Sequence, residues 1–239
     1  MIKGYVHSIQ TLGTLDGPGV RFVVFTQGCN LRCSCCHNPD TWNYNDRTQF
    51  APEEIVKRVK RYKEYFGDEG GITFSGGEPL LQADFVYETF RLCHLEGINT
   101  CLDTSGSVLN DSVVKLLGET DVVLLDVKYT SDDLYKKHVG CDMDRVLRFL
   151  DVLQERNIKT IIRQVVIPTV NDYEENFLKL KELVDRYTVV QKVELLPFKN
   201  ICTTKYDMLN IDFPFRDIPL PKESDMQKYQ NMVKNTLPK

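Results

Sequence analysis

Three cysteines stand close together near the beginning of the sequence. Cys29, Cys33 and Cys36 have the spacing C-x3-C-x2-C, within the run GCNLRCSCCHNP at residues 28–39. Thiolate sulfur is a preferred ligand of zinc and of iron–sulfur clusters, and a four-iron cluster on three cysteines leaves one iron open to a ligand that is not protein. The spacing therefore predicts a metal site on these side chains, with its chemistry at the open iron.

Zinc is the alternative metal for this cysteine cluster. A closed structural zinc site needs four ligands, and the two additional candidates nearby, Cys35 and His37, flank Cys36 directly. Adjacent residues are cramped as ligands of one tetrahedral ion, so the sequence favours an iron–sulfur cluster. Cys35 also competes as an iron ligand, but the x3 and x2 spacings select Cys36.

Polar and glycine-rich motifs follow three further apolar runs that are typical of strands. They are SGGEP at 75–79, DTSG at 103–106 and DVK at 126–128. Glycines let a ligand approach the backbone closely, although GGEP alone is also an ordinary turn sequence. Asp126 and Lys128 are two residues apart on a strand and share one face, where a simple ion pair is the alternative to a binding role.

Alternating apolar and amphipathic runs indicate the elements that position these motifs. Predicted strands lie at 21–26, 71–75, 98–102, 122–127, 158–167 and 192–196, and predicted helices at 52–66, 83–96, 110–117, 144–156, 174–184 and 224–236. This alternation predicts an α/β fold with a parallel sheet, which we expect to form a partial (β/α)6 TIM-like barrel with outer helices. Active sites of such folds gather at the carboxyl ends of the strands, so the four motif-bearing loops are expected to converge on one mouth.

The composition limits the class of protein. A chain of 239 residues with 42% hydrophobic content suits one domain, with a core at about 15–200 and an irregular extension from 200 that ends in the last helix. The net charge of -4, with both signs mixed, gives no electrostatic case for nucleic acid. No run approaches the ~18 apolar residues of a membrane span, and the first residues lack a signal peptide's apolar core. We therefore expect a cytoplasmic protein without a membrane partner.

The eight cysteines indicate metal or redox use rather than disulfides, because four of them fall between residues 29 and 36. Cys93 lies in a helical pattern and Cys101 in a strand-like run, and both are interpreted as small buried hydrophobic residues. The basic residues between 57 and 63 are interpreted as a solvated helix face.

C-x3-C-x2-C after the first predicted strand, followed by GGE after the second, resembles the pattern of the radical S-adenosylmethionine (SAM) superfamily. Within it, the chain resembles the pyruvate formate-lyase-activating enzymes over nearly its whole length, through TLDGPG, QGCNLRC, CHNPDTW, FSGGEPLLQ, CLDTSG, LLDVK and LLPF. Other activases of glycyl-radical enzymes often carry a ferredoxin-like insert with more cysteines after the first motif. About forty residues separate Cys36 from Gly76 without a cysteine, which favours the pyruvate formate-lyase branch.

The resemblance implies roles for individual residues. Cys29, Cys33 and Cys36 are expected to ligate three irons of one 4Fe-4S cluster, while the amino and carboxylate groups of SAM chelate the fourth. The implied SAM-binding residues are Cys35, Cys36, His37, Ser75, Gly76, Gly77, Glu78, Asp103, Asp126, Val127, Lys128, Arg163 and Lys199. Within this set, carbonyls of the glycine turn are expected to accept hydrogen bonds from the SAM ammonium, Glu78 adds a matching negative charge, and Lys128 lies near the SAM carboxylate.

Further roles concern catalysis and a cation. The expected catalytic residues are Lys128, Asp126 and Asp16, the last meeting the protein substrate unless it is a plain turn residue. Asp103, Thr104 and Asp126 are expected to lie around a small monovalent cation.

Four assignments have a stated alternative or depart from the family pattern. Arg163 faces the cavity or, equally, lies at the surface or in an ion pair. The His37 ring is a hydrogen-bonded structural imidazole in the simpler interpretation, with its backbone along the adenine. Cys35 stands where the family usually has an aromatic residue, and Lys199 stands where histidine is frequent.

The implied activity is the anaerobic activation of pyruvate formate-lyase. An electron from flavodoxin or ferredoxin cleaves SAM reductively to methionine and a 5'-deoxyadenosyl radical, which takes a hydrogen atom from one glycine Cα of the protein substrate. We expect the activase to be a monomer. The alternatives are a radical SAM enzyme acting on another glycyl-radical protein or a small molecule, and an iron–sulfur electron-transfer protein.

The ligand choice gives a direct prediction. Replacing Cys36 with alanine should abolish cluster-dependent SAM cleavage, because one iron loses its thiolate, while Cys35→Ala should leave it largely intact. The measurement is 5'-deoxyadenosine formation after anaerobic reconstitution, and the opposite pattern would overturn the assignment of Cys36.

Overall fold

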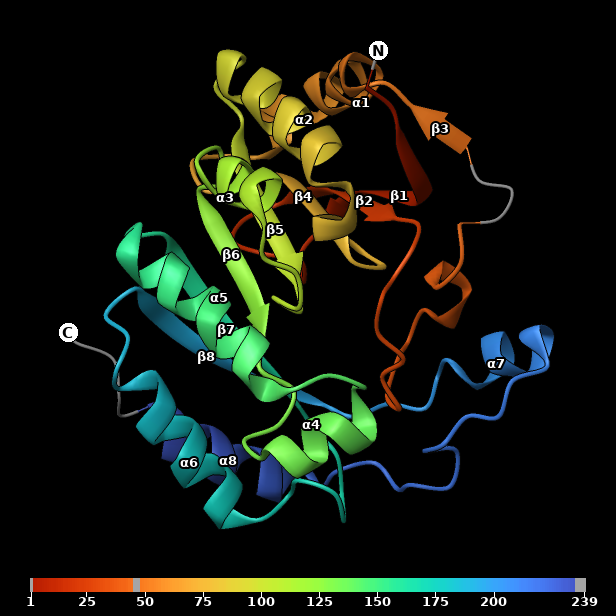
Figure 1. Ribbon diagram of the computed structural model, residues 1–239, viewed down its shortest axis with the longest axis vertical. Coiled ribbons are helices and arrows are strands. Elements are labelled where there is room, and N and C mark those ends of the chain that lie inside the picture. Colours follow the sequence, from red (N-terminus) through yellow and green to blue (C-terminus); the bar gives the residue numbers. More distant parts are fainter. Residues whose placement is uncertain (1, 45–47, 235–239) are drawn as a thin grey trace. The chain divides into compact units, whose positions relative to one another are not determined.

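The computed structural model describes residues 2–44 and 48–234. Two compact units divide the chain, the first comprising Met1–Asn30 and Thr41–Leu124 and the second Leu31–Asp40 and Leu125–Lys239. The short segment 31–40 therefore belongs to the second unit although both of its flanks belong to the first. Figure 1 labels the elements of both units.

The first unit contains the amino-terminal strands and three helices. Its strands are β1 Gly4–Gly13, β2 Arg21–Thr26, β3 Thr48–Phe50, β4 Gly71–Gly76 and β5 Asn99–Thr104, and its helices are α1 Pro52–Val59, α2 Ala83–Leu95 and α3 Asp111–Leu117. The register pairs β2, β4 and β5 in parallel, whereas β1 is antiparallel to both β2 and β3. The carboxyl ends of β2, β4 and β5 consequently lie at one edge of the sheet.

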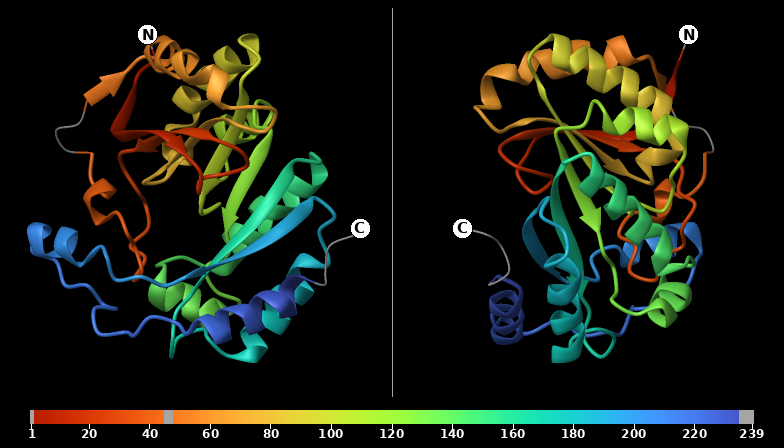
Figure 2. Two further views of the ribbon diagram at one scale, coloured as in Figure 1. Left: turned by 180° about the vertical axis from the view of Figure 1, so that it is seen from behind. Right: turned by 60° about the vertical axis from the view of Figure 1, so that its left-hand side comes forward.

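The second unit contains the carboxyl-terminal elements. They are the parallel pair β7 Lys159–Val166 and β8 Val190–Pro197 and the helices α4 Asp132–His138, α5 Met143–Glu155, α6 Glu174–Val184, α7 Thr203–Leu209 and α8 Glu223–Lys234. α6 and α8 lie side by side (Figures 1 and 2), with the rings of Phe177 and Tyr229 stacked at 4.1 Å. β6 Val122–Asp126 begins in the first unit and ends in the second.

The predicted α/β class with a parallel-dominated sheet is confirmed. The strand order in the described residues is β3-β1-β2-β4-β5-β6-β7-β8, and all six predicted strands are present within a few residues of their expected bounds. The predicted helix 52–66 changes at Val59 into a 3₁₀ helix, Lys60–Tyr65. The end of the predicted helix 224–236 lies outside the described residues.

Among the strands and α-helices of the described residues, the prediction missed four: β1, β3, α4 and α7. β1 exposes much of its length and carries the polar sequence GYVHSIQTLG, so no apolar run marks it. α4 is short and buries only Tyr135, and α7 lies inside the stretch 200–222 that was expected to be irregular. Each of these elements depends on packing rather than on a hydrophobic period of its own.

Aromatic and aliphatic side chains of the strands and α2 form the core of the first unit. Phe74 of β4 contacts the rings of Phe85 and Phe90 edge-on at 5.6 Å, and all three are at most 2% exposed. Burying each such side chain contributes about 1.5–3 kcal/mol. Cys93 and Cys101 are fully buried, as predicted, and burial raises the pKa of Cys93 to about 12. None of the described helices has the length and apolar character needed to cross a membrane.

A histidine joins the end of α2 to the loop after α3. His94 lies 2.7 Å from Glu119 Oε2 through Nδ1 and 3.1 Å from Asp121 Oδ2 through Nε2. Thr100 adds its hydroxyl and backbone N–H to the same Asp121 carboxylate. Burial opposes the imidazolium, but the two carboxylates outweigh it and raise the pKa of His94.

The raised pKa predicts a pH-dependent contribution to stability. It is fully present below the unfolded-state pKa of about 6.5 and is lost as pH rises through the folded-state value. We expect His94→Gln to lower the free energy of unfolding by up to about 1 kcal/mol at pH 5.5, because the site is partly exposed, and by much less at pH 8.5. Urea unfolding at both pH values measures this. An equal loss at both, or an unchanged loss in a Glu119→Gln/Asp121→Asn background, would contradict it.

Candidate functional site

The turn after β4 packs on the segment that carries Cys29. Gly77 donates its N–H to Thr26 O at 2.9 Å, and Glu78 donates its N–H to Gly28 O at 2.8 Å. The same segment bonds on its other side, where Cys29 N–H donates to Trp42 O at 3.1 Å. The end of β2 and the first predicted ligand cysteine are therefore held by main-chain bonds of the first unit.

The two glycines of this turn are required by packing. Gly76 has φ +105°, and a Cβ built on it would lie 2.5 Å from Thr26 N. A Cβ on Gly77 would lie 2.1 Å from Gly28 O. The sequence predicted that these glycines let a ligand approach the backbone. In the structure, their lack of side chains lets the backbone at the end of β2 pack closely on the turn.

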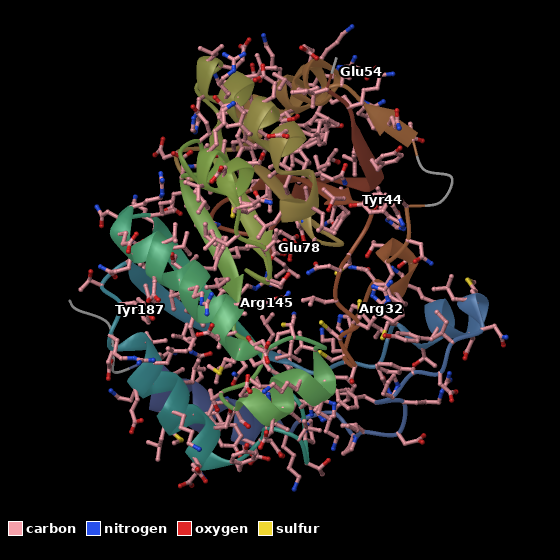
Figure 3. The ribbon with its side chains drawn as sticks, in the orientation of Figure 1. Arg32, Tyr44, Glu54, Glu78, Arg145 and Tyr187 are labelled. Atoms are coloured by element: carbon pink, nitrogen blue, oxygen red, sulfur yellow. The ribbon has the colours of Figure 1, made fainter. Side chains whose placement is uncertain are left out.

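Glu78 is the buried acid of this turn (Figure 3), with 1% of its surface exposed. Its Oε1 accepts hydrogen bonds from Thr104 Oγ1 at 2.5 Å and Leu80 N at 3.2 Å, and its Oε2 accepts from the backbone N–H, at 3.0 Å, and the hydroxyl of Ser105. Burial raises the pKa of Glu78, and the hydrogen bonds act against that rise. Both oxygens serve contacts inside the first unit, while the contact to SAM stays a prediction.

Ser75 and Asp103 lie side by side on neighbouring parallel strands. Ser75 Oγ donates to Asp103 Oδ2 at 2.6 Å. Two residues before them, Thr73 and Cys101 are register partners, so all four side chains lie on one face of the sheet. The expected cation near Asp103 and Thr104 stays a prediction, with the Thr104 hydroxyl already donating to Glu78.

The loop with Asp16 lies on that same face. Thr73 Oγ1 donates to the backbone carbonyl of Asp16 at 2.8 Å. The fully buried Arg21 anchors the loop by donating from Nη1 to Pro18 O at 3.4 Å and to Glu69 O at 2.9 Å. The structure thereby assigns Asp16 a main-chain role, and its contact with a protein substrate stays a prediction.

In the second unit, α4 holds the segment with Cys33 and Cys36, which contains the labelled Arg32 (Figure 3). Ser34 N–H donates to His138 O at 2.8 Å, and the Ser34 hydroxyl lies 3.2 Å from His138 Nδ1. Burial lowers the pKa of His138. Cys36 N–H donates to Cys33 O at 3.0 Å, so the two predicted ligands share a tight turn.

The region after β8 contacts the same segment. Tyr206 of α7 donates its hydroxyl to Cys36 O at 3.2 Å. The ring Nε2 of His37 lies 2.8 Å from Lys199 O, and burial lowers the pKa of His37. The interpretation of His37 as a hydrogen-bonded imidazole matches this contact, and Lys199 contributes its carbonyl while its side chain is exposed.

Asp126 and Lys128 form the ion pair considered from the sequence, with Lys128 Nζ 2.7 Å from Asp126 Oδ2. Tyr135 of α4 accepts the Lys128 N–H at 3.0 Å through its hydroxyl. Burial opposes the ammonium, but Asp126, Cys33 and Cys35 outweigh it and hold the pKa of Lys128 well above its usual value. Burial also raises the pKa of Cys35 to about 11.

Arg163 adopts the ion-pair alternative. Its Nε lies 3.7 Å from Glu194 Oε2, and the two residues are register partners on β7 and β8. Its carbonyl accepts the N–H of buried Val127 at 2.9 Å. The hydrogen bond between Val127 and Arg163 thus positions the end of β6. The predicted SAM contacts of Val127 and Arg163 stay predictions.

The donor set fits an iron–sulfur cluster. None of the eight cysteines forms a disulfide, and Cys29, Cys33 and Cys36 are neither fully buried nor fully exposed. In the described ranges no three His, Cys, Asp or Glu side chains are already gathered as metal ligands. The assignment of the three cysteines as ligands therefore stays a prediction that rests on their type and spacing.

Sequence reasoning missed Ser105, Ser107, Tyr135 and His138, whose contacts support the predicted residues. Ser105 lies in the DTSG motif, of which only Asp103 and Thr104 received a role, and Ser107 follows the motif directly. Tyr135 and His138 occur in α4, which no periodic pattern announces.

The packing of Gly77 gives a prediction. Gly77→Ala should lower the free energy of unfolding by about 1–3 kcal/mol, because the new Cβ would press on the backbone of Gly28. Gly118→Ala is the matched control, since Gly118 has a helical φ of -68° and only one neighbouring atom, at 3.2 Å. Denaturant unfolding of both variants measures the difference, and equal stability would contradict the close approach.

Comparison with known proteins places these features in context. Residues 23–181 match the family model of the Radical SAM superfamily. The chain is 42% identical to the pyruvate formate-lyase-activating enzyme of Clostridium pasteurianum over 99% of this chain and 100% of that one. It is 38% identical to the pyruvate formate-lyase 1-activating enzyme of Escherichia coli (strain K12), over 97% and 96%.

Solved structures show a similar fold. Streptococcus suis SuiB bound to S-adenosylmethionine has a TM-score of 0.68 at 16% identity, covering 87% of this chain and 44% of that one. A domain of pyruvate-formate lyase-activating enzyme from Bacteroides vulgatus ATCC 8482 has a TM-score of 0.58 at 21% identity, covering 70% and 94%.

Proposed function

The chain belongs to the radical SAM superfamily, in the family of the pyruvate formate-lyase-activating enzymes, and we propose that it activates pyruvate formate-lyase by generating a glycyl radical on it. Membership implies a 4Fe-4S cluster and SAM. The observation that carries the proposal is the 42% identity over the full length of a curated activating enzyme. The whole chain acts as one radical SAM domain.

A bound 4Fe-4S cluster and SAM, with one electron from outside, would supply the chemistry of hydrogen abstraction from a glycine Cα by a 5'-deoxyadenosyl radical. Cys29, Cys33 and Cys36 hold the cluster. The glycine turn after β4 offers its carbonyls to the SAM ammonium. The protein also excludes water from the reacting atoms, because a carbon radical attacks any nearby hydrogen donor.

Lys128 binds and orients the carboxylate of SAM in this proposal. Its raised pKa keeps it protonated at neutral pH, and it is largely buried, so the ammonium is a strong partner for a carboxylate. Asp126 balances the charge of Lys128 before SAM binds. Asp16, in contrast, acts toward the protein substrate.

A variant Lys128→Met should therefore weaken SAM binding, because the ammonium that pairs with the SAM carboxylate is removed.

The partners follow from the same chemistry. The protein substrate is pyruvate formate-lyase, whose glycine loop must leave its own core to be reached. Flavodoxin or ferredoxin supplies the electron, and the activase acts as a monomer. Eight cysteines without a disulfide suit the reducing cytoplasm, where we place the protein.

An anaerobic reconstitution tests the function. The chain is loaded with iron and sulfide, reduced, and mixed with SAM and the pyruvate formate-lyase of the same organism, and the electron paramagnetic resonance spectrum is recorded. We expect a glycyl-radical doublet that is absent with Cys29→Ala and with a substrate whose radical glycine is alanine. Formation of 5'-deoxyadenosine without the doublet would mean another glycyl-radical enzyme is the partner. An intact cluster with neither product would refute the enzyme proposal.

A further inference from the structure

A chain of polar contacts links Asn30 to Glu78 within the first unit. Asn30 Nδ2 donates to Ser107 Oγ at 3.1 Å, the hydroxyl oxygens of Ser107 and Ser105 lie 3.0 Å apart, and the Ser105 hydroxyl donates to Glu78 Oε2. Ser107 and Glu78 are buried, at 5% and 1% exposure. The contacts join loops that follow three different strands, β2, β4 and β5.

The Ser105 hydroxyl has a single proton, which goes to the Glu78 carboxylate because that acceptor makes the stronger bond. Ser107 Oγ lies within hydrogen-bond distance of both amide atoms of Asn30, with Nδ2 at 3.1 Å as donor and Oδ1 at 3.3 Å as acceptor. The two serine hydroxyls therefore connect the Asn30 side chain to the Glu78 carboxylate.

The residues on either side of Cys29 in the sequence are both connected to Glu78 by hydrogen bonds. The residue before it, Gly28, offers its carbonyl to the Glu78 N–H at 2.8 Å. The residue after it, Asn30, is bonded through the two serines to the Glu78 carboxylate. One residue therefore fixes both neighbours of the first predicted iron ligand.

We propose that Ser105 and Ser107 are positioning residues, which set the backbone of Cys29 relative to the Gly76-Gly77 turn by joining Asn30 to the Glu78 carboxylate. This rests on the proposed function, because it gives Cys29 the role of a cluster ligand. The side chains of the two serines contact Glu78 and Asn30, and they act on Cys29 through these residues.

Apo chain provides the first readout. Alkylation of each cysteine by iodoacetamide is followed by mass spectrometry in the wild type and in Ser107→Ala. We expect the rate at Cys29 to rise about tenfold, the effect of losing one hydrogen bond of the larger kind, while Cys33 and Cys36 of the second unit keep their rates. Ser107→Thr, which retains the hydroxyl, should restore the wild-type rate. Ser112→Ala of α3 is the control outside the polar chain.

Reconstituted protein provides the second readout. Ser107→Ala should retain several-fold less iron after gel filtration and raise the KM for SAM in 5'-deoxyadenosine formation more than it lowers kcat. A double variant with Asn30→Ala should be no worse than either single variant, because both break the same chain of contacts. Thermal unfolding of the apo variants should differ little from that of Ser112→Ala.

The outcomes separate this proposal from the proposed function. Unchanged alkylation at Cys29, or additive losses in the double variant, would overturn the positioning role. So would losses that simply follow a lowered melting temperature. Neither alkylation nor iron retention requires pyruvate formate-lyase, so a missing glycyl-radical doublet would refute the function while leaving the positioning result standing.

Discussion

The burial of the Glu78 carboxylate is the constraint that holds together the loops of the candidate site that belong to the first unit. A charged group out of contact with water is costly unless donors surround it, and Thr104, Ser105 and Leu80 provide four hydrogen bonds. Those donors belong to the last residue of β5, to the residue that follows it, and to the 3₁₀ helix Pro79–Gln82 after the turn. Satisfying one carboxylate thus ties the ends of β4 and β5 together, and the Glu78 backbone adds the end of β2.

The second unit holds its cysteines by a different device. α4 and the region after β8 bond the backbone of the segment 31–40 from two elements, through His138 and Tyr206. These contacts use carbonyls and N–H groups of the segment, so they set its path while leaving the sulfur atoms of Cys33 and Cys36 free of disulfides. A ligand loop positioned by its backbone can present several side chains to one metal centre.

Two buried charges mark the opposite ends of the parallel strands in the first unit. Arg21, at the amino end of β2, is surrounded mainly by carbonyl oxygens, and Glu78, beyond the carboxyl end of β4, by N–H and hydroxyl donors. Each charge is satisfied by several partial charges rather than by a single counter-ion, which suits residues that must stay in place. The ion pair of Asp126 and Lys128 is different, because it leaves part of both side chains accessible to a bound ligand.

The sequence by itself determined the parallel strands, the helices with a clear apolar face and the family, since apolar periods and cysteine spacing are local properties of the chain. It also located the motifs at the strand ends. Only the tertiary structure decided what Glu78, Ser107 and His138 do, because their bonds join residues 27, 77 and 104 positions apart. Elements such as α4 and β1 could likewise not be predicted from the sequence, because they lack a hydrophobic pattern of their own. Residues distant along the chain stabilise them.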